Sequence, residues 1–135
     1  MAGPKFDITD EQIDVLVTAF YARARKDATL GPIFLNAIGT SNSAWQTHEA
    51  HISSFWRNAL GIDRSFTGNP MLKHLANHQI EPEHFPIWLE IFNQTAKDVL
   101  PQPAAEGISA LANRIGQSLS WGLTQFRNPD VPKLG

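Results

Sequence analysis

The sequence contains no cysteine among its 135 residues. Without a thiol, the chain cannot form disulfides, cysteine-ligated iron–sulfur clusters or zinc–thiolate sites, and it has no cysteine nucleophile. It also lacks an apolar run near the roughly 18 residues that a membrane-spanning helix needs. Residues 1–12 lack the basic and apolar regions of a signal peptide. We therefore expect a protein of the reducing cytoplasm that contacts no membrane.

The sequence also lacks an excess of charge of either sign. The chain has 11 Lys and Arg against 13 Asp and Glu, with no basic run and no acidic tail. Binding a phosphate backbone needs a concentrated positive stripe, so we expect no nucleic-acid partner. The hydrophobic content of 42% is enough for a packed core, which excludes a disordered chain. Residues 1–135 are expected to form one domain, with a helical core over about 9–126 and short disordered ends.

Helical periodicity begins near the amino terminus. Thr9-Asp10-Glu11-Gln12 has the pattern of a capping box, which satisfies free backbone N–H groups at a helix start. Leu30-Gly31-Pro32 is predicted to interrupt the helix, and a short piece over 33–38 then ends at Gly39. Helical spacing places these side chains on one face of the first helix: Ile13, Leu16, Val17, Phe20, Tyr21 and Ala24.

The rest of the chain also has helical spacing. Asn42 or Ser43 is predicted to cap a helix that runs to Gly61. Pro70 suits the first position of a short helix, residues 81–83 are predicted to start a long one, and a last helix follows Pro101 and Pro103. Because no segment shows sustained period-two alternation, the predicted fold class is all-α.

The histidines are the first candidates for chemistry. His74 lies in a predicted short helix between apolar neighbours, where an imidazole can be a metal ligand or an ordinary half-buried side chain. His78, four residues on, is a second candidate for the same role. His48 shares an apolar stripe with Trp45 and Ile52, so it is either satisfied internally or faces a cavity.

Two alternatives stay open at this point. His48 and His51 lack the zinc-protease spacing, although both with one carboxylate could form a non-haem metal site; otherwise we interpret His51 as structural. The second alternative is a haem-free helical module that binds a partner through an aromatic face. Tyr21 and Trp88 each place one hydrogen-bond donor on a large apolar body, which suits either core packing or a ligand site.

Several short motifs occur in a specific order along the chain. In this order and spacing, from about Ile13 to Leu123, the chain resembles the third group of truncated haemoglobins, a bacterial group that lacks the paired-glycine signatures of other truncated forms. The motifs are Phe20-Tyr21, Lys26-Asp27-x-x-Leu30-Gly31-Pro32-Ile33-Phe34, Asn36-Ala37-Ile38-Gly39-Thr40-Ser41, Trp45-x-x-His48, Ile52-x-x-Phe55-Trp56, Gly68-x-Pro70-x-x-Lys73-His74-Leu75 and Phe85-x-x-Trp88-Leu89-x-x-Phe92.

The resemblance implies a truncated globin fold, a two-over-two helical sandwich around haem b (iron protoporphyrin IX). It implies that His74 is the proximal iron ligand. It places Tyr21, His48 and Trp88 at the distal positions, around the bound ligand. The residues that it places against the cofactor are Phe34, Ile52, Phe55, Trp56, Lys73, Leu75 and Phe85.

The resemblance is less regular at Phe66, and it leaves the contacts to the haem propionates open. Phe66 stands where relatives often have a tyrosine, which removes a hydroxyl from the loop before the proximal helix. The residues that neutralise the haem propionates are open, with Lys73, Arg57 and Arg64 as candidates.

The implied function is binding of O2, NO, CO, cyanide or peroxide at a pentacoordinate-accessible iron. Distal donors worth roughly 1–3 kcal/mol each would slow ligand escape, which suits O2/NO or peroxide redox chemistry better than transport. The resemblance is therefore compatible with NO dioxygenase-like or peroxidase-like activity. Either activity would take electrons from an unidentified external reductase, because nothing in the chain resembles a flavin or nicotinamide domain.

Overall fold

The computed structural model describes residues 6–64, 66–69, 73–74, 77 and 79–127. The described part is all-helical and contains no strand, as expected. The helices are α1 (Asp10–Ala24), α2 (Leu30–Ile38), α3 (Asn42–Ala59), α5 (His84–Val99) and α6 (Gln102–Arg127).

The predicted capping box starts α1. The Thr9 hydroxyl accepts the Gln12 N–H at 3.1 Å, and the Gln12 side chain accepts the Thr9 N–H at 2.9 Å. This reciprocal pair satisfies two backbone donors that have no partner within the helix.

The break between α1 and α2 is stabilised by Asp27. Its carboxylate accepts the backbone N–H groups of Thr29 and Leu30, both at 2.9 Å, and so serves the start of α2. Gly31 and Pro32 follow in the first turn of α2. An interruption between the two helices is confirmed, but it lies at residues 25–29, and the predicted breaking residues Leu30, Gly31 and Pro32 belong to α2.

The caps of two later helices differ from the expectation. Ser41, not Asn42 or Ser43, caps α3, because its hydroxyl accepts the Ala44 N–H at 3.2 Å. Residues 81–83 form a turn before α5, which begins at His84. Lys73 and His74 are helical, but the other residues of the short helix predicted after Pro70 lie mostly outside the described ones.

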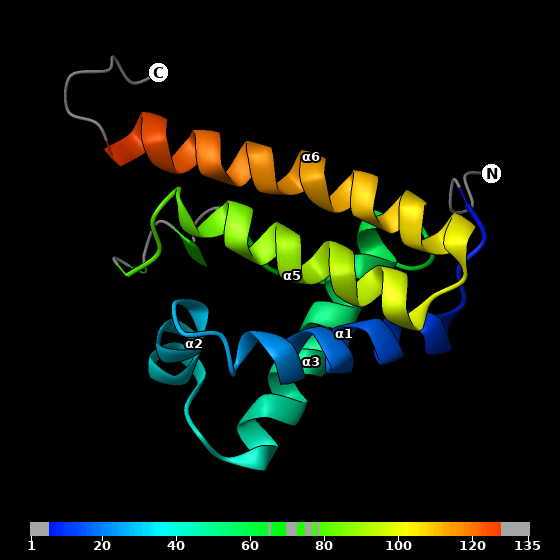
Figure 1. Ribbon diagram of the computed structural model, residues 1–135, viewed down its shortest axis with the longest axis horizontal. Helices are drawn as coiled ribbons and strands as arrows, with labels where there is room; N and C mark the ends of the chain where they lie inside the picture. The colour runs from blue at the N-terminus through cyan, green and yellow to red at the C-terminus, as the bar shows by residue number, and fades with distance from the viewer. Residues whose placement is uncertain (1–5, 65, 70–72, 75–76, 78, 128–135) are drawn as a thin grey trace.

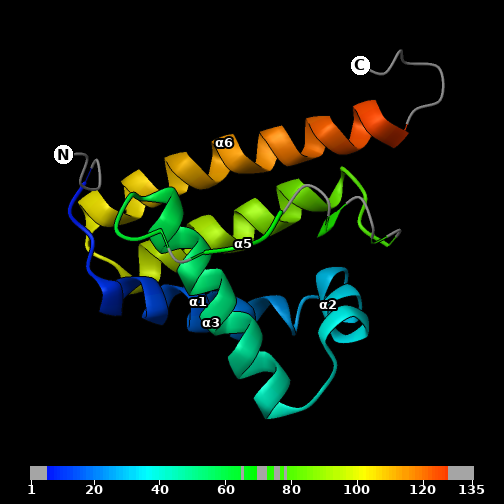
Figure 2. The same ribbon diagram turned by 180° about the vertical axis from the view of Figure 1, so that it is seen from behind.

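The helices form two layers. α5 and α6 lie side by side as an antiparallel pair, and α1 packs against both α5 and α3 (Figure 1). Seen from behind, α3 crosses α1, while α2 lies beyond the carboxyl end of α1 (Figure 2). This is the two-over-two sandwich that the family resemblance implies.

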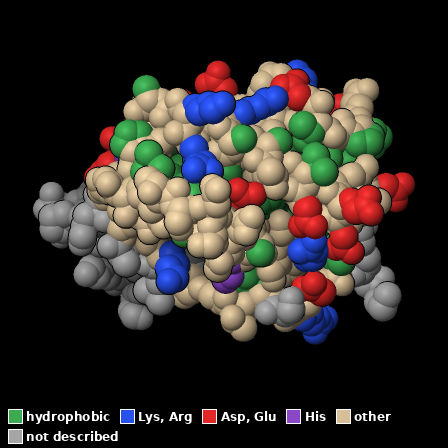
Figure 3. Space-filling model, turned by 90° about the horizontal axis from the view of Figure 1, so that it is seen from below, with side chains coloured by type: hydrophobic (Ala, Val, Ile, Leu, Met, Phe, Trp, Pro, Cys, Tyr) green, Lys and Arg blue, Asp and Glu red, His purple; other side chains and the backbone are tan. Residues whose placement is uncertain are grey.

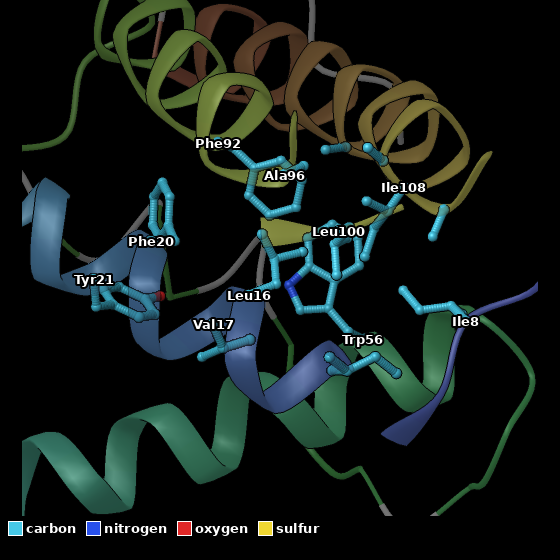
Figure 4. Close-up of a cluster of buried hydrophobic side chains, with 14 of the residues drawn as sticks. Ile8, Leu16, Val17, Phe20, Tyr21, Trp56, Phe92, Ala96, Leu100 and Ile108 are labelled. Atoms are coloured by element: carbon cyan, nitrogen blue, oxygen red, sulfur yellow. The ribbon is translucent and has the colours of Figure 1, made fainter. Parts of the chain in front are cut away.

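The core lies where α1, α3, α5 and α6 meet (Figure 4). Each helix turns one apolar stripe inward, which gives a continuous cluster of large side chains. Tyr21, which carries a polar hydroxyl, lies at one end of this cluster. The labelled members are Ile8, Leu16, Val17, Phe20, Tyr21, Trp56, Phe92, Ala96, Leu100 and Ile108.

The surface carries mixed charges. On the described part of the face in Figure 3, Lys and Arg side chains are interspersed with Asp and Glu, without a continuous basic patch. Among the described helices, none is long and apolar enough to cross a membrane.

Candidate functional site

A cavity of about 480 Å³ opens among α1, α2, α3 and α5. Its volume falls within the range of roughly 300–1,000 Å³ that small-molecule and cofactor sites occupy. α6 closes part of its wall with Ile115, Gly116 and Leu119. Most lining side chains are apolar, and a few polar groups converge among them, as in binding sites generally.

The structure brings nearly all of the sequence-predicted site residues to this cavity. Leu75 is the exception, because it lies outside the described residues. The predicted residues that line the cavity are Tyr21, Phe34, His48, Ile52, Phe55, Trp56, Lys73, His74, Phe85 and Trp88.

Tyr21 reaches the cavity from the inner face of α1. Its ring is buried and meets Phe34 edge to face, with centroids 5.5 Å apart. Burial, followed by the negative charge of Glu49, raises the pKa of the Tyr21 hydroxyl far above its ordinary value. The hydroxyl therefore keeps its proton and stays a donor.

His48 enters from α3, and its ring centroid lies 4.9 Å from that of Tyr21. Its Nε2 atom is buried and has no hydrogen-bond partner in the described part of the protein. Burial, followed by the neighbouring charge of His51, lowers the pKa of His48 to about 4. His48 is therefore neutral near pH 7, with a polar atom left unsatisfied beside the cavity.

Trp88 is fixed by an aromatic row that continues into the core. Its ring stacks on Phe92 with centroids 5.1 Å apart, and it meets the Phe20 ring edge to face at 5.3 Å. Trp56 also stacks on Phe92, with ring centroids 5.2 Å apart. Because packed aromatic rings restrain one another, the Trp88 indole has a defined place on the cavity wall.

His74 approaches from the segment that precedes α5. The Lys73 N–H donates to the Asn69 carbonyl at 3.1 Å, a bond of helical spacing that supports this segment. The His74 imidazole is half-buried and packs against Phe85, with centroids 5.7 Å apart. The segment before α5, and not one of the long helices, therefore brings the His74 imidazole to the cavity.

The rim of the cavity has one formally charged side chain among the described lining residues, that of Lys73. His51 and Lys73 are exposed and line it, while no aspartate or glutamate is found among the described lining residues. Of the three propionate candidates, only Lys73 reaches the cavity. Arg57 is paired with Asp10 and Asp14, at 2.8 and 2.9 Å, and neither Arg57 nor Arg64 lines the cavity.

Sequence reasoning missed several wall residues. His51 was interpreted as structural, yet it lines the cavity and packs against Phe66, with centroids 4.8 Å apart. His84 and the α6 residues were also missed, although Ile115 and Leu119 follow the apolar spacing of α6. That spacing marks a buried face, but it does not distinguish a core contact from a cavity wall.

The residues present fit a haem better than a free metal ion. No group of three His, Asp or Glu side chains that could hold a metal ion occurs among the described residues, which gives no support to the non-haem site from His48, His51 and a carboxylate. A mostly apolar cavity with an imidazole and an orphaned buried nitrogen suits a flat apolar cofactor with a polar ligand.

The five helices of the described residues, in two layers around such a cavity, define a haem globin of the truncated class. No family model matches the chain. A group 3 truncated haemoglobin of Campylobacter jejuni subsp. jejuni is 44% identical over 92 residues, which cover 67% of this chain and 72% of that protein. The chain therefore belongs to the group III truncated haemoglobins.

A solved structure agrees with this assignment. The crystal structure of the group III truncated haemoglobin from Campylobacter jejuni matches with a TM-score of 0.84 and 36% sequence identity. The match covers 89% of this chain and 94% of the other. The protein is accordingly a bacterial globin that binds haem and a small ligand, and the alternative of a haem-free helical module is not supported.

Proposed function

We propose that this globin holds haem b through His74 and retains O2 or another diatomic ligand by hydrogen bonds from Tyr21, His48 and Trp88. The observation that carries the proposal is the His48 Nε2 atom, which is buried beside the cavity without a partner in the described part of the protein. An unsatisfied buried polar atom is costly, so a polar ligand in the cavity would remove that cost.

When bound, haem supplies an iron that takes a diatomic ligand. The chain supplies the surroundings: His74 would bind the iron through its imidazole, and most of the lining side chains are apolar. Tyr21 donates its hydroxyl proton, since the raised pKa keeps that proton in place. A neutral His48 can donate or accept at Nε2, depending on its tautomer.

These groups favour retention of the ligand over its delivery. A hydrogen bond in a dry site contributes about 1–3 kcal/mol, and about 1.4 kcal/mol changes a rate or an equilibrium tenfold. Two well-aligned donors would thus slow ligand escape by orders of magnitude. Chemistry with NO or peroxide is the use we propose for such a site, with electrons from a separate reductase.

The test is the optical spectrum of the purified protein with His74→Gly beside wild type. We expect wild-type protein to bind haem stoichiometrically and to show a CO-sensitive ferrous spectrum. The variant should lose axial ligation, and added imidazole should restore it. His84→Gln, a second cavity histidine, is the matched control and should leave the spectrum unchanged. Unaltered axial ligation in His74→Gly would overturn the assignment.

A further inference from the structure

Trp45 lies directly behind two of the proposed ligand donors. It is only 1% exposed and sits on α3 one turn before His48. Its ring centroid is 5.6 Å from that of Tyr21 and 5.8 Å from that of His48. Trp45 is absent from the described lining of the cavity, so it contacts the donors without reaching the space that they surround.

Two anchors hold the Trp45 ring in place. The indole Nε1–H donates to the Gly39 carbonyl at 2.8 Å. The Arg25 guanidinium lies 4.2 Å from the ring centroid, a cation–π arrangement. Gly39 has φ of 102°, a backbone conformation that favours glycine. The ring is therefore tied to the turn between α2 and α3 and to the residue that follows α1.

The His48 imidazole depends on packing for its orientation. Its buried Nε2 has no partner in the described part of the chain, so no hydrogen bond at that atom fixes the ring. Hydrogen bonds weaken steeply as their angle departs from linearity. A small rotation of the imidazole or the phenol would therefore change the hydrogen bonding to a ligand.

We propose that Trp45 is a positioning residue, which holds Tyr21 and His48 in the mutual arrangement that directs both polar groups at the ligand. The Gly39 carbonyl and the Arg25 guanidinium are part of this arrangement, because they fix Trp45 itself. The inference rests on the proposed function, in which Tyr21 and His48 bind the ligand.

The test uses Trp45→Phe in the haem-loaded protein. Phenylalanine keeps an aromatic ring but removes the Nε1–H and part of the ring face that Tyr21 and His48 contact. We expect the C–O stretching band of the CO complex to shift or split, and the O2 dissociation rate to rise about three- to tenfold. Trp121→Phe, at a tryptophan that is 58% exposed on α6, is the matched control and should change neither measurement.

The outcomes distinguish the positioning role of Trp45 from the proposed ligand contacts of Tyr21 and His48. An unchanged band and rate in Trp45→Phe, together with clear changes in Tyr21→Phe, would overturn the positioning role and leave the proposed function intact. Unchanged values in both Tyr21→Phe and His48→Leu would overturn the proposed function.

A second variant covers the case in which Trp45→Phe does not fold, as judged by circular dichroism. Arg25→Gln removes the guanidinium from the ring while Trp45 stays in place. A displaced C–O band and a faster O2 release in this variant would support the positioning role. Wild-type values in Arg25→Gln would then overturn it.

Discussion

The rings of Tyr21 and His48 meet edge to face, with centroids 4.9 Å apart and an interplanar angle of 76°. Tyr21 comes from α1 and His48 from α3, two helices that pack against each other. The helix pairing thus brings two polar tips to one side of a single cavity. Since the rings touch, a change at either position alters the surroundings of the other.

Tyr21→Phe removes the hydroxyl and keeps the ring contacts. We expect the O2 dissociation rate to rise about 10- to 100-fold, because a buried donor contributes about 1–3 kcal/mol. The rate is measured by stopped-flow displacement of O2 with CO. His51→Gln, at the exposed rim, serves as the control and should stay within about twofold of wild type. A wild-type rate in Tyr21→Phe would remove the phenol from the ligand site.

Ligand release should be insensitive to pH from 6 to 9. The raised pKa of Tyr21 keeps its hydroxyl protonated throughout this range. The pKa of His48, lowered to about 4, keeps its imidazole neutral over the same range. Neither donor changes its charge, so we expect a flat plot of the O2 dissociation rate against pH. A step near pH 6.5 that persists in His51→Gln would show that His48 titrates normally and is solvated.

The fold was largely predictable because its signals are local. The Thr9–Gln12 capping box and the apolar spacing of α1 are both read within one or two turns. The caps were less certain, since Ser41, Asn42 and Ser43 all carry suitable side chains and only the backbone geometry selects Ser41. Propensity alone does not distinguish adjacent capping residues.

The sequence predicted residues that meet at one cavity, but it did not predict the full set of residues that line that cavity. Tyr21, His48, His74 and Trp88 were assigned through motifs, and the structure places all four at one cavity. Arg57 stayed an open candidate for the haem propionates, because a basic residue near the site has the same sequence signal whether it faces a cofactor or an acidic side chain. Its pairing with α1 is a long-range contact that no periodicity reveals.

Lys73 and Arg57 should differ in their effect on haem retention. Lys73 lines the rim of the cavity, so Lys73→Ala should speed haem loss about three- to tenfold by removing a charge that attracts the cofactor's carboxylates. Arg57→Ala should leave haem loss unchanged but lower the free energy of unfolding by about 1 kcal/mol. Transfer of haem to an apo-globin acceptor gives the first quantity, and urea denaturation gives the second.

Lys73→Arg provides the matched control for this comparison, because it keeps the charge beside His74 while changing the side chain. We expect it to retain haem nearly as wild type does. Faster haem loss in Arg57→Ala would instead indicate that its pairs with Asp10 and Asp14 support the cavity through α1 and α3.

Gly31 marks a close approach between the end of α1 and the start of α2. A Cβ atom at this position would lie 2.6 Å from the Arg25 carbonyl oxygen, and that oxygen belongs to the backbone and cannot rotate away. Gly31 also donates its N–H to the Asp27 carbonyl at 2.9 Å, so a shift of the turn would strain this bond. We expect Gly31→Ala to lower the free energy of unfolding by about 1–3 kcal/mol, as overpacking commonly does.

Urea denaturation of Gly31→Ala beside Pro32→Ala measures this cost, since Pro32 is the exposed neighbour in the same turn and should cost less than about 1 kcal/mol. The close approach also sets where α2 begins, and α2 supplies Leu30 and Phe34 to the cavity. Haem loss should therefore accelerate in Gly31→Ala and not in Pro32→Ala. Equal urea midpoints for the two variants would mean that the turn adjusts freely to the added Cβ atom. This contact would then not hold α2 over the cavity.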